Sequence, residues 1–563
     1  MIGRGALAVL VIAVATLTYP GAAAVALATR FSVTPTSPGG GGDTSWLHVE
    51  HPAGQIPFIA DAFGRKVILH GAIPASLVEF GGSSAPVYPI DPAAYADGRC
   101  PANVPANRYP PLCQADLAAM AEVGFNSLRL PVSWSLLEPA RGHFSQLYID
   151  RIAQVVDWAR AIGMYVIVDM HQNAYSPFVG AGPSVNLAYN SGAPAWATFT
   201  DGLPSHVYGG QRELNPAVFE AATNFWYDRA GIQDEYITAL GELVRRFKDD
   251  SNVAGYGVYN EPWPGWNLPP GFEDLLLFPF YRRVIDAVTG ARDGLPCWSG
   301  FFMPAVCGYR DLGIHDRRQL LFLDPGLLRE VTDFPTHLGL PISSYPNVVL
   351  AMHAYTHIYT LDTFIGEKPG TANYPWGGYE QSYWFAEREA KAMDSALFVS
   401  EFGNDPAYDD LILNAQLDEQ DRHGLGFAFW TWRENGSTGW GMFDEAPAAT
   451  GGSTHCMRAD RERLLARVYP RAIADPTATY AYNPDDGAFT LRSDGRRGDP
   501  ATIVYVPREV TGSISTGGAA TFSTVRRSDG SRTVRRTVGR SIHDFHGKRT
   551  NADNGLLLNR LGL

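Results

Sequence analysis

Two glutamates in this sequence stand where hydrolytic chemistry could take place. Glu261 follows Asn260 and precedes Pro262 after one apolar run, and Glu401 ends another apolar run, LFVSE. Hydrolysis of a glycosidic bond with retention needs one carboxyl group to protonate the leaving oxygen and a second, about 5–5.5 Å away, to attack the anomeric carbon. We therefore assign Glu261 as the acid/base and Glu401 as the nucleophile. We expect burial and the negative charge of Glu401 to raise the pKa of Glu261.

Other polar side chains stand at or near the ends of similar apolar runs, where an unpaired charge would be costly. Arg129 can hold Glu401 ionised through charge-assisted hydrogen bonds, and Tyr355 can donate to the same carboxylate. Asn260 suits the sugar 2-OH, a contact that strengthens as the transition state develops. These residues predict a polar network around a bound sugar.

Four further residues complete the predicted site. Asp169 can accept hydrogen bonds from the hydroxyls of the ring being cleaved, and Trp432 offers a flat face beneath that ring. His171 and His353 suit the sugar hydroxyls or positions behind the reacting groups. Each residue also has a structural alternative: a histidine is often only a hydrogen-bonding partner, and Asn-Glu-Pro could be a capping turn. Their occurrence in order at successive run ends favours the site.

The elements that would position these residues alternate between short apolar runs and segments with helical spacing. Fully apolar strands that alternate with helices predict a parallel sheet covered on both faces, and eight such repeats predict a (β/α)8 barrel. An open doubly wound sheet is the alternative, but the first run lacks a phosphate-binding Gly-rich turn. The eight expected strands are 67–71, 127–131, 165–170, 256–260, 320–324, 348–353, 397–401 and 427–432.

The fold class we predict is therefore an α/β protein, a TIM barrel followed by a smaller C-terminal β-sandwich. The barrel is expected over residues 45–470 and the sandwich, with a basic tail, over residues 471–563. Alternating runs such as ATIVYVP, divided by Gly, Pro and Asp, indicate the sandwich strands. The Arg-rich stretch after Ser523 could add strands or form a loose tail.

The N-terminus has the features of an export signal. Arg4 supplies the positive start, residues 6–17 are apolar, and small residues near Ala26 and Ala28 offer a cleavage site. We expect a signal peptide over residues 1–28, a flexible leader over residues 29–44 and a secreted protein. An uncleaved N-terminal anchor is the alternative.

Composition and cysteines limit the partners. The 563 residues carry a net charge of −13, which argues against nucleic acid as a partner. The five cysteines suggest two local disulfides in an exported chain, Cys100–Cys113 and Cys297–Cys307, with Cys456 left over. The spacing of His and Cys indicates no metal site, and we expect no cofactor and a monomer.

The motifs resemble glycoside hydrolase family 5, and within it the endoglycoceramidase group. The resemblance rests on NSLRLPVSW, VIVDMHQN, YGVYNEPW, MHAYTH, VSEFG and FAFWTWRE, and on VYPRAIA leading into a C-terminal sandwich. It implies the same acid/base and nucleophile, with Arg129, Asn260, His353 and Tyr355 as their supports. It also implies that Asp169, His171 and Trp432 line the sugar subsite, and that the substrate is a glycolipid cleaved between sugar and ceramide without a cofactor.

Two departures leave the preferred sugar open. Asn173 stands where the group usually has Asp, and no Lys follows the first strand. A lipid would need an apolar groove, for which PWPGW, GYEQSYWFAE and LLLFPFY are candidates, although LLLFPFY could equally pack the barrel exterior. Such a protein could also contact a membrane surface. The alternatives are an endo-β-glycanase of cellulase or mannanase type that acts on polysaccharide, and a non-catalytic glycan- or lipid-binding surface protein.

Overall fold

The computed structural model of the chain divides into two units, residues 1–37 and residues 38–563. All of the residues that the structure describes lie in the second unit. The described residues are 44–78, 89–101, 109–179, 191–208, 212–267, 271–292, 306–332, 342, 344–355, 379–434, 439–444, 456–494, 498–511, 521–526 and 530–537.

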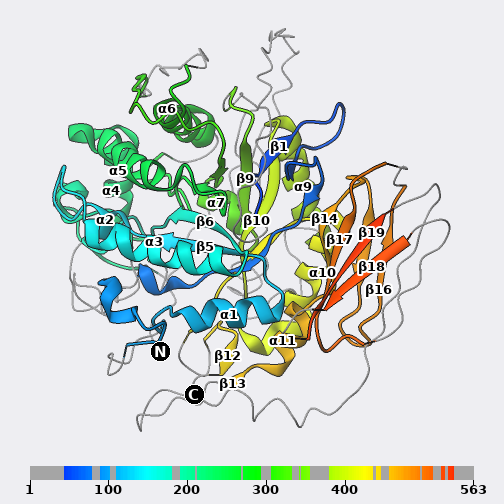
Figure 1. Cartoon of the computed structure of the whole chain (residues 1–563). Helices are drawn as coiled ribbons and strands as arrows, with labels where there is room; N and C mark the ends of the chain where they lie inside the picture. Colours follow the sequence, from blue (N-terminus) through cyan, green and yellow to red (C-terminus); the bar gives the residue numbers. More distant parts are fainter. Residues whose placement is uncertain are drawn as a thin grey trace, which may run out of the picture. The chain divides into compact units, whose positions relative to one another are not determined.

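Eight parallel strands close into a barrel (Figure 1), which confirms the predicted fold class. Each expected run contributes one strand, in chain order. The strands are β4 (His70–Ala72), β5 (Ser127–Val132), β6 (Tyr165–Met170), β7 (Val253–Gly257), β8 (Leu320–Leu323), β9 (Val348–His353), β10 (Ala396–Phe402) and β11 (Phe427–Phe429). The ring closes where β11 pairs with β4, with Phe427 opposite His70.

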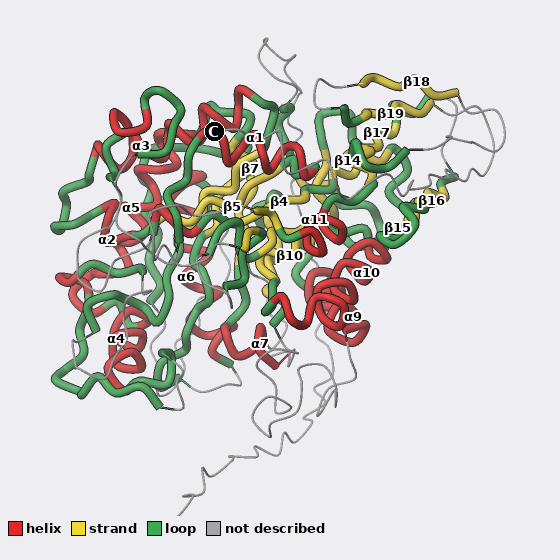
Figure 2. The backbone as a smooth tube through the Cα atoms, turned by 90° about the horizontal axis from the view of Figure 1, so that it is seen from below, coloured by secondary structure: helices red, strands yellow, loops and turns green. Residues whose placement is uncertain are grey.

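Helices surround these strands, which lie in the middle of the view in Figure 2. Their apolar faces pack on the outward side chains of the strands in one continuous core, and this burial is the main stabilising contribution to such a layer. The helices are α1 (Gln114–Val123), α2 (Trp134–Leu137), α3 (Gln146–Ala161), α4 (Pro216–Trp226), α5 (Ile232–Phe247), α6 (Phe278–Thr289), α7 (Leu327–Thr332), α9 (Tyr379–Ala392), α10 (Asn414–His423) and α11 (Ala459–Leu465).

The barrel interior is filled by alternate residues of the strands. On β6, Val166 and Val168 face the helices, whereas Tyr165 and Ile167 join a second core inside the barrel. Because side chains alternate along a strand, the next inward residue of β6 is Asp169. The packed lumen therefore ends in polar side chains at the carboxyl end of the strands, where active sites of this fold lie.

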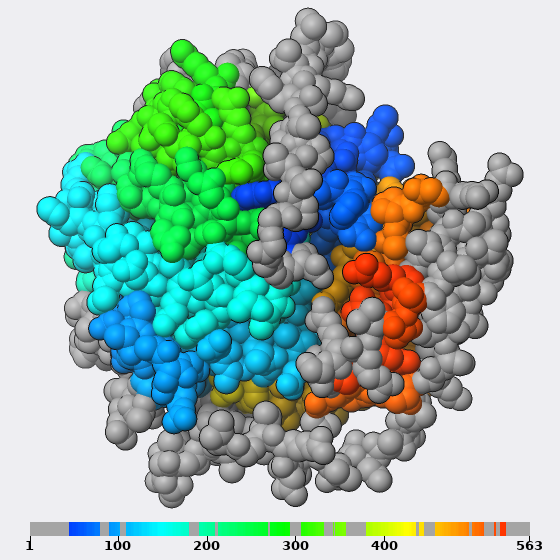
Figure 3. Space-filling view, in the orientation of Figure 1, coloured from blue at the N-terminus to red at the C-terminus, as the bar shows by residue number. Residues whose placement is uncertain are grey.

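A second, antiparallel sheet combines both ends of the described chain. Its order is β1-β2-β3-β14-β17-β19-β18, and its strands are β1 (His48–Glu50), β2 (Phe58–Ala60), β3 (Lys66–Val67), β14 (Tyr469–Ile473), β17 (Thr502–Val506), β18 (Thr521–Arg526) and β19 (Arg532–Thr537). Val67 of β3 pairs with Ala472 of β14, and Figure 3 shows the blue N-terminal segment beside the orange C-terminal one. The Arg-rich stretch supplies the hairpin of β18 and β19.

A hairpin of β15 (Thr479–Tyr482) and β16 (Phe489–Arg492) completes this part of the chain. Its inward residues Tyr480, Phe489 and Leu491 share a core with Val504 and Tyr505 of β17. A short pair of β12 (Phe443–Asp444) and β13 (Cys456–Met457) lies outside both sheets.

Of the expected disulfides, Cys100–Cys113 is present. Cys307 is also disulfide-bonded, while Cys297 lies outside the described residues, as do the expected signal peptide and leader. Within the described ranges, none of the helices has the length and apolar character needed to span a membrane. The stretch LLLFPFY leads into α6 and is almost wholly buried, so it does not form an exposed groove.

Candidate active site

Several barrel strands direct a polar side chain into the site through their inward register. Leu128 and Leu130 of β5 face the helices, so Arg129 between them points inward. On β9, Val349 and Ala351 fill the lumen, and His353 follows in the same register. Phe322 of β8 also faces the lumen, and Asp324, just after the end of this strand, continues the same inward register. Alternation along each strand thus positions these groups together.

Glu401 reaches the site because β10 contains a bulge. Ala396 and Phe398 face the lumen, so strict alternation would point Ser400 inward and Glu401 outward. Val399 pairs with Met352 but Glu401 pairs with His353, which gives β10 one residue more than β9. A bulge of this kind redirects a side chain, and here it aligns Glu401 with the inward-facing His353.

Glu261 lies in a backbone conformation that non-glycine residues rarely adopt. Its φ is 44°, and a left-handed L-residue costs about 1–2 kcal/mol. The Gln172 side-chain amide holds this turn by donating to the carbonyl oxygens of Asn260 and Glu261, at 2.7 and 2.8 Å. The backbone N–H of Glu261 donates to Asp324 at 3.2 Å. The strained turn is therefore fixed from both sides.

The predicted nucleophile is held at both of its oxygens. Arg129 Nη1 donates to Glu401 Oε2 at 2.7 Å, and Tyr355 Oη donates to Oε1 at 2.8 Å. Arg129 Nη2 also donates to Asp169 Oδ1 at 3.0 Å and to Asn260 Oδ1 at 2.8 Å. The planar guanidinium thus orients three site residues at once. The structure brings Arg129, Glu401, Tyr355, Asp169 and Asn260 together as the sequence predicts.

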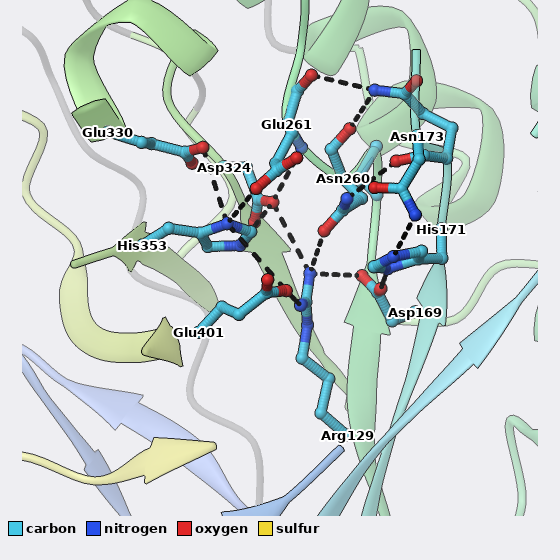
Figure 4. Close-up of polar contacts among 12 residues, drawn as sticks. Arg129, Asp169, His171, Asn173, Asn260, Glu261, Asp324, Glu330, His353 and Glu401 are labelled. Atoms are coloured by element: carbon cyan, nitrogen blue, oxygen red, sulfur yellow. Dashed lines mark hydrogen bonds and ion pairs between the residues drawn. The ribbon is translucent and has the colours of Figure 1, made fainter. Parts of the chain in front are cut away.

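His353 connects the two glutamates. Its Nδ1 lies 3.1 Å from Glu261 Oε1 and 4.0 Å from Glu401 Oε2 (Figure 4). These two carboxylate oxygens are therefore at most the sum of the two distances apart, about 7 Å. This limit includes the separation of about 5–5.5 Å typical of retaining glycosidases and reaches only the lower end of the range of about 6.5–9.5 Å typical of inverting ones.

The charges of the site contradict the predicted direction of the Glu261 pKa. Burial acts to raise the pKa of Glu261, but the hydrogen bond and the positive charge of His353 outweigh it and leave this pKa lowered. Burial acts to lower the pKa of His353, but Glu330, Glu401 and Asp324 raise it well above the usual range. These directions favour a proton on His353 over a proton on Glu261, and the expected rise in the pKa of Glu261 was wrong because it omitted the neighbouring His353.

Asp169 and His171 form a second part of the network. His171 Nδ1 lies 3.0 Å from Asp169 Oδ2, and its Nε2 lies 3.4 Å from the Asn173 amide nitrogen. Burial acts to raise the pKa of Asp169, but Arg129 and His171 leave it lowered. Both oxygens of Asp169 are engaged by protein groups, so its contact with a sugar hydroxyl remains a prediction. Asn260 Oδ1 retains one lone pair for a sugar 2-OH.

The structure does not bring Trp432 into the site. Trp432 is 1% exposed, packs against Phe443, and donates its indole N–H to Asp116 at 3.0 Å. Trp430 is only half-buried, and its ring is stacked parallel to that of His171 with 5.8 Å between centroids. The assignment of the flat aromatic face to Trp432 is corrected to Trp430, because β11 ends at Phe429, earlier than the apolar run suggested.

Sequence reasoning also missed two buried acids. Asp324 was recognised only as the end of a strand, although its carboxylate lies 3.2 Å from His353 Nε2 and 3.6 Å from Arg129 Nη2. Glu330 lies on α7, and its Oε2 is 3.5 Å from His353 Nδ1. The inward register of LLFLD could have identified Asp324. Glu330 follows a loop and a helix start, so no strand-end signal marks it.

Two sets of described side chains have ligand-type atoms close enough to hold a metal ion. In the first, Cys100 and Cys113 form a disulfide and offer no thiolate. In the second, Glu261, Glu330 and His353, the imidazole Nδ1 lies near both carboxyl groups, so two protons, one on this nitrogen and one on a carboxyl group, can balance their charge without a metal ion. We assign this second set to proton sharing.

Comparison with known proteins confirms the resemblance predicted from the motifs. Residues 104–288 match the family model Cellulase (glycosyl hydrolase family 5). Endoglycoceramidase I of Rhodococcus hoagii (strain 103S) is 24% identical over 454 residues, which cover 80% of this chain and 78% of that protein. Together with the two carboxyl groups of the site, these similarities support a glycosyl hydrolase.

Solved structures show the same architecture. A crystal structure of an endogalactoceramidase is 25% identical, with a TM-score of 0.68 over 90% of this chain and 100% of that one. Endo-glycoceramidase II from Rhodococcus sp., in a complex with ganglioside GM3, is 24% identical, with a TM-score of 0.64 over 88% of this chain and 99% of that one. The second likeness shows a shared fold.

Proposed function

We propose that this protein is a secreted, retaining glycoside hydrolase that cleaves the bond between sugar and ceramide in glycosphingolipids or related glycolipids. The observation that carries the proposal is the approach of Glu261 and Glu401 to one nitrogen of His353, at 3.1 and 4.0 Å. The similarity to proteins named endoglycoceramidase and endogalactoceramidase supports the glycolipid substrate.

The geometry supports a two-step reaction. Glu401, oriented by Arg129 and Tyr355, attacks the anomeric carbon while Glu261 gives its proton to the leaving oxygen. Glu261, now a carboxylate, then removes a proton from water as the water cleaves the sugar–Glu401 ester. The proton that Glu261 needs is supplied through the adjacent His353, whose pKa the surrounding carboxylates raise well above its usual range.

An exposed aromatic residue in the loop that follows the acid/base supports an amphipathic substrate. Trp266, in the loop that follows Glu261, is 51% exposed and contacts Phe219 with 4.7 Å between ring centroids. A half-buried indole at the surface suits contact with lipid chains or a membrane surface. Trp266→Ala should raise KM for a micellar glycolipid without changing KM for a soluble aryl glycoside. The matched control is Trp384→Ala, at another exposed tryptophan on α9.

The test of the substrate is a panel of aryl glycosides, soluble glucan and one glycosphingolipid, with products separated by thin-layer chromatography. The proposal predicts release of ceramide, and loss of that release in Glu261→Gln and Glu401→Gln. If only glucan is cleaved, the glycolipid substrate is refuted and the endo-β-glycanase alternative is supported, in line with the family model named Cellulase. If nothing is cleaved, a non-catalytic binding protein is supported.

Secretion is a separate part of the proposal. It rests on the positive, apolar and small-residue pattern of residues 1–28. Expression of the full chain followed by N-terminal sequencing of the protein in the medium should give a start close to residue 27 or 29. Retention of the intact N-terminus on membranes would support the uncleaved anchor instead.

A further inference from the structure

The catalytic cluster contains five acids, Asp169, Glu261, Asp324, Glu330 and Glu401. Among the described residues, Glu330 is the one of these acids that has no hydrogen-bond donor. It is 0% exposed, and neither of its carboxyl oxygens has a hydrogen-bond partner in the described part of the chain. By contrast, Asp169 accepts from Arg129, and Glu401 accepts from Arg129 and Tyr355. A buried carboxylate without a donor is costly, so Glu330 favours its neutral form.

The charge of the whole cluster leads to the same conclusion. Five carboxyl groups surround the site, and their exposed side-chain fractions do not exceed 15%. The cations that act on them are Arg129, which is permanently charged, Arg212, whose charge acts on Glu261, and two histidines. Even with both imidazoles protonated, the acids would exceed the cations, and a buried net charge is unfavourable. At least one carboxyl group must therefore carry a proton.

The proton on His353 lies close to two acceptors. His353 Nδ1 is 3.1 Å from Glu261 Oε1 and 3.5 Å from Glu330 Oε2 (Figure 4). We propose that Glu330 is a positioning residue that acts through His353, stores a proton, and keeps Nδ1 protonated while Glu261 alternates between acid and base. This inference rests on the proposed function, since it concerns how that reaction obtains its protons.

The proton movements balance without any external reagent. In the free protein Glu330 and His353 Nδ1 each carry one proton, and Glu261 carries none. When His353 passes its proton to Glu261, Glu330 passes its own to the vacated Nδ1, which leaves a Glu330 carboxylate beside an imidazolium. When Glu261 later takes a proton from water and returns one to Nδ1, Glu330 recovers its proton. The three groups thus share two protons until Glu261 protonates the leaving oxygen, one proton while the sugar is bound to Glu401, and two again once Glu261 has taken a proton from water.

The charged groups around Glu330 lie at the ends of several barrel strands. Asp324, Glu261 and Glu401 repel a negative charge on Glu330, and His353 attracts it; burial nonetheless dominates and raises the pKa of Glu330 well above its usual range. Arg329, the adjacent cation on α7, is directed instead to Glu389 of α9 at 2.6 Å. No cation other than His353 therefore lies within ion-pair distance of Glu330 among the described residues.

The test is the pH dependence of kcat/KM for an alkyl glycoside, whose poor leaving group requires acid catalysis, in wild type and Glu330→Gln. Glutamine keeps the shape and neutrality of the protonated acid but can never become negative. Because the negative charge of Glu330 raises the pKa of His353, its loss should let His353 deprotonate at lower pH. The alkaline limb of the kcat/KM profile of Glu330→Gln should therefore shift to lower pH by about one to three pH units.

A matched control separates this effect from general damage. Glu389→Gln neutralises another buried acid, paired with Arg329 outside the cluster, and should leave the alkaline limb unchanged even if stability falls. An unchanged limb in Glu330→Gln, or equal shifts in both variants, would overturn the inference. So would a loss of wild-type activity on dialysis against EDTA, because a metal ion would then occupy the place of the protons.

A second measurement does not depend on activity. The infrared spectrum of Glu261→Gln at neutral pH should contain the C=O band of a protonated carboxyl group, and this band should vanish in Glu261→Gln with Glu330→Gln. A band that persists in the double variant contradicts the inference, even if Glu330→Gln alone is unstable or no substrate is found. If the wild type cleaves no glycoside but its spectrum contains the Glu330 band, the proposed function is refuted, whereas the protonation of Glu330 is still supported.

Discussion

Gly257→Ala should disrupt the active site by displacing the side chain of Asp169. Gly257 pairs with Asp169 across β6 and β7, and a Cβ at this glycine would lie 2.1 Å from Asp169 Oδ1 and 3.0 Å from its Cγ. Ordinary contacts require about 3.5 Å, so this carboxylate oxygen must move away by roughly 1.4 Å. The same Oδ1 accepts the 3.0 Å hydrogen bond from Arg129, which orients Glu401.

The size of the effect follows from this chain of contacts. Overpacking of a filled core costs about 1–3 kcal/mol of stability, and a misplacement of about 1 Å at a reacting group costs about 100-fold in rate. We therefore expect Gly257→Ala to lower kcat/KM for an aryl glycoside about 100-fold, and to lower the free energy of unfolding by about 1–3 kcal/mol.

The assay compares kcat/KM and urea unfolding of Gly257→Ala with those of Gly308→Ala. Gly308 has no atom within 4 Å of an added Cβ, so this control should match wild type in both measurements. The reasoning is refuted if Gly257→Ala keeps kcat/KM within about threefold of wild type, because Arg129 and Glu401 would then not depend on the position of Asp169.

Three further predictions concern the acid/base, the aromatic face and the disulfide. Glu261→Gln should lose activity on alkyl glycosides, but its first-step burst should survive with dinitrophenyl glycosides, which need no protonation of the leaving group; equal loss on both substrates would contradict the assignment. Trp430→Ala should lower kcat/KM about 10- to 100-fold because it removes about 1.5–3 kcal/mol of apolar contact with the sugar, whereas Trp432→Phe should lower stability with little effect on KM; the reverse result would restore Trp432 to the site. Replacing Cys100 and Cys113 by serine opens a loop with a sequence separation of 13 and should lower the free energy of unfolding by about 3 kcal/mol in urea titration, and an unchanged midpoint would show that the bridge contributes nothing.

The barrel could be predicted from the sequence because its strands are buried on both faces. Runs such as YVIVDM and VVLAMH contain almost only apolar residues until the last position, and both strands have the bounds expected for them. Polar residues at or near the ends of such runs have few other places to lie, which is why Arg129, Asn260, Glu261, His353 and Glu401 were identified together. The family motifs then supported the same residues.

The remaining features depend on contacts that alternation cannot reveal. Glu330 lies on a short helix rather than at a strand end, and only its distance from His353 reveals its importance. The lowered pKa of Glu261 follows from that same neighbour. The exchange of Trp432 for Trp430 depended on a strand that ends three residues before the end of the apolar run. The pairing of β3 with β14 joins segments about 400 residues apart, for which no local pattern exists.

Hydrolysis with retention depends most directly on a covalent bond between the sugar and Glu401. Incubation with a 2-deoxy-2-fluoroglycosyl fluoride, followed by proteolysis and mass spectrometry, should place the trapped sugar on the Glu401 side chain of β10 (Ala396–Phe402). Glu261→Gln should still be labelled, and Glu401→Gln should not. A label on another residue would contradict the account, as would substrate hydrolysis with inversion at the anomeric carbon and no trapped ester.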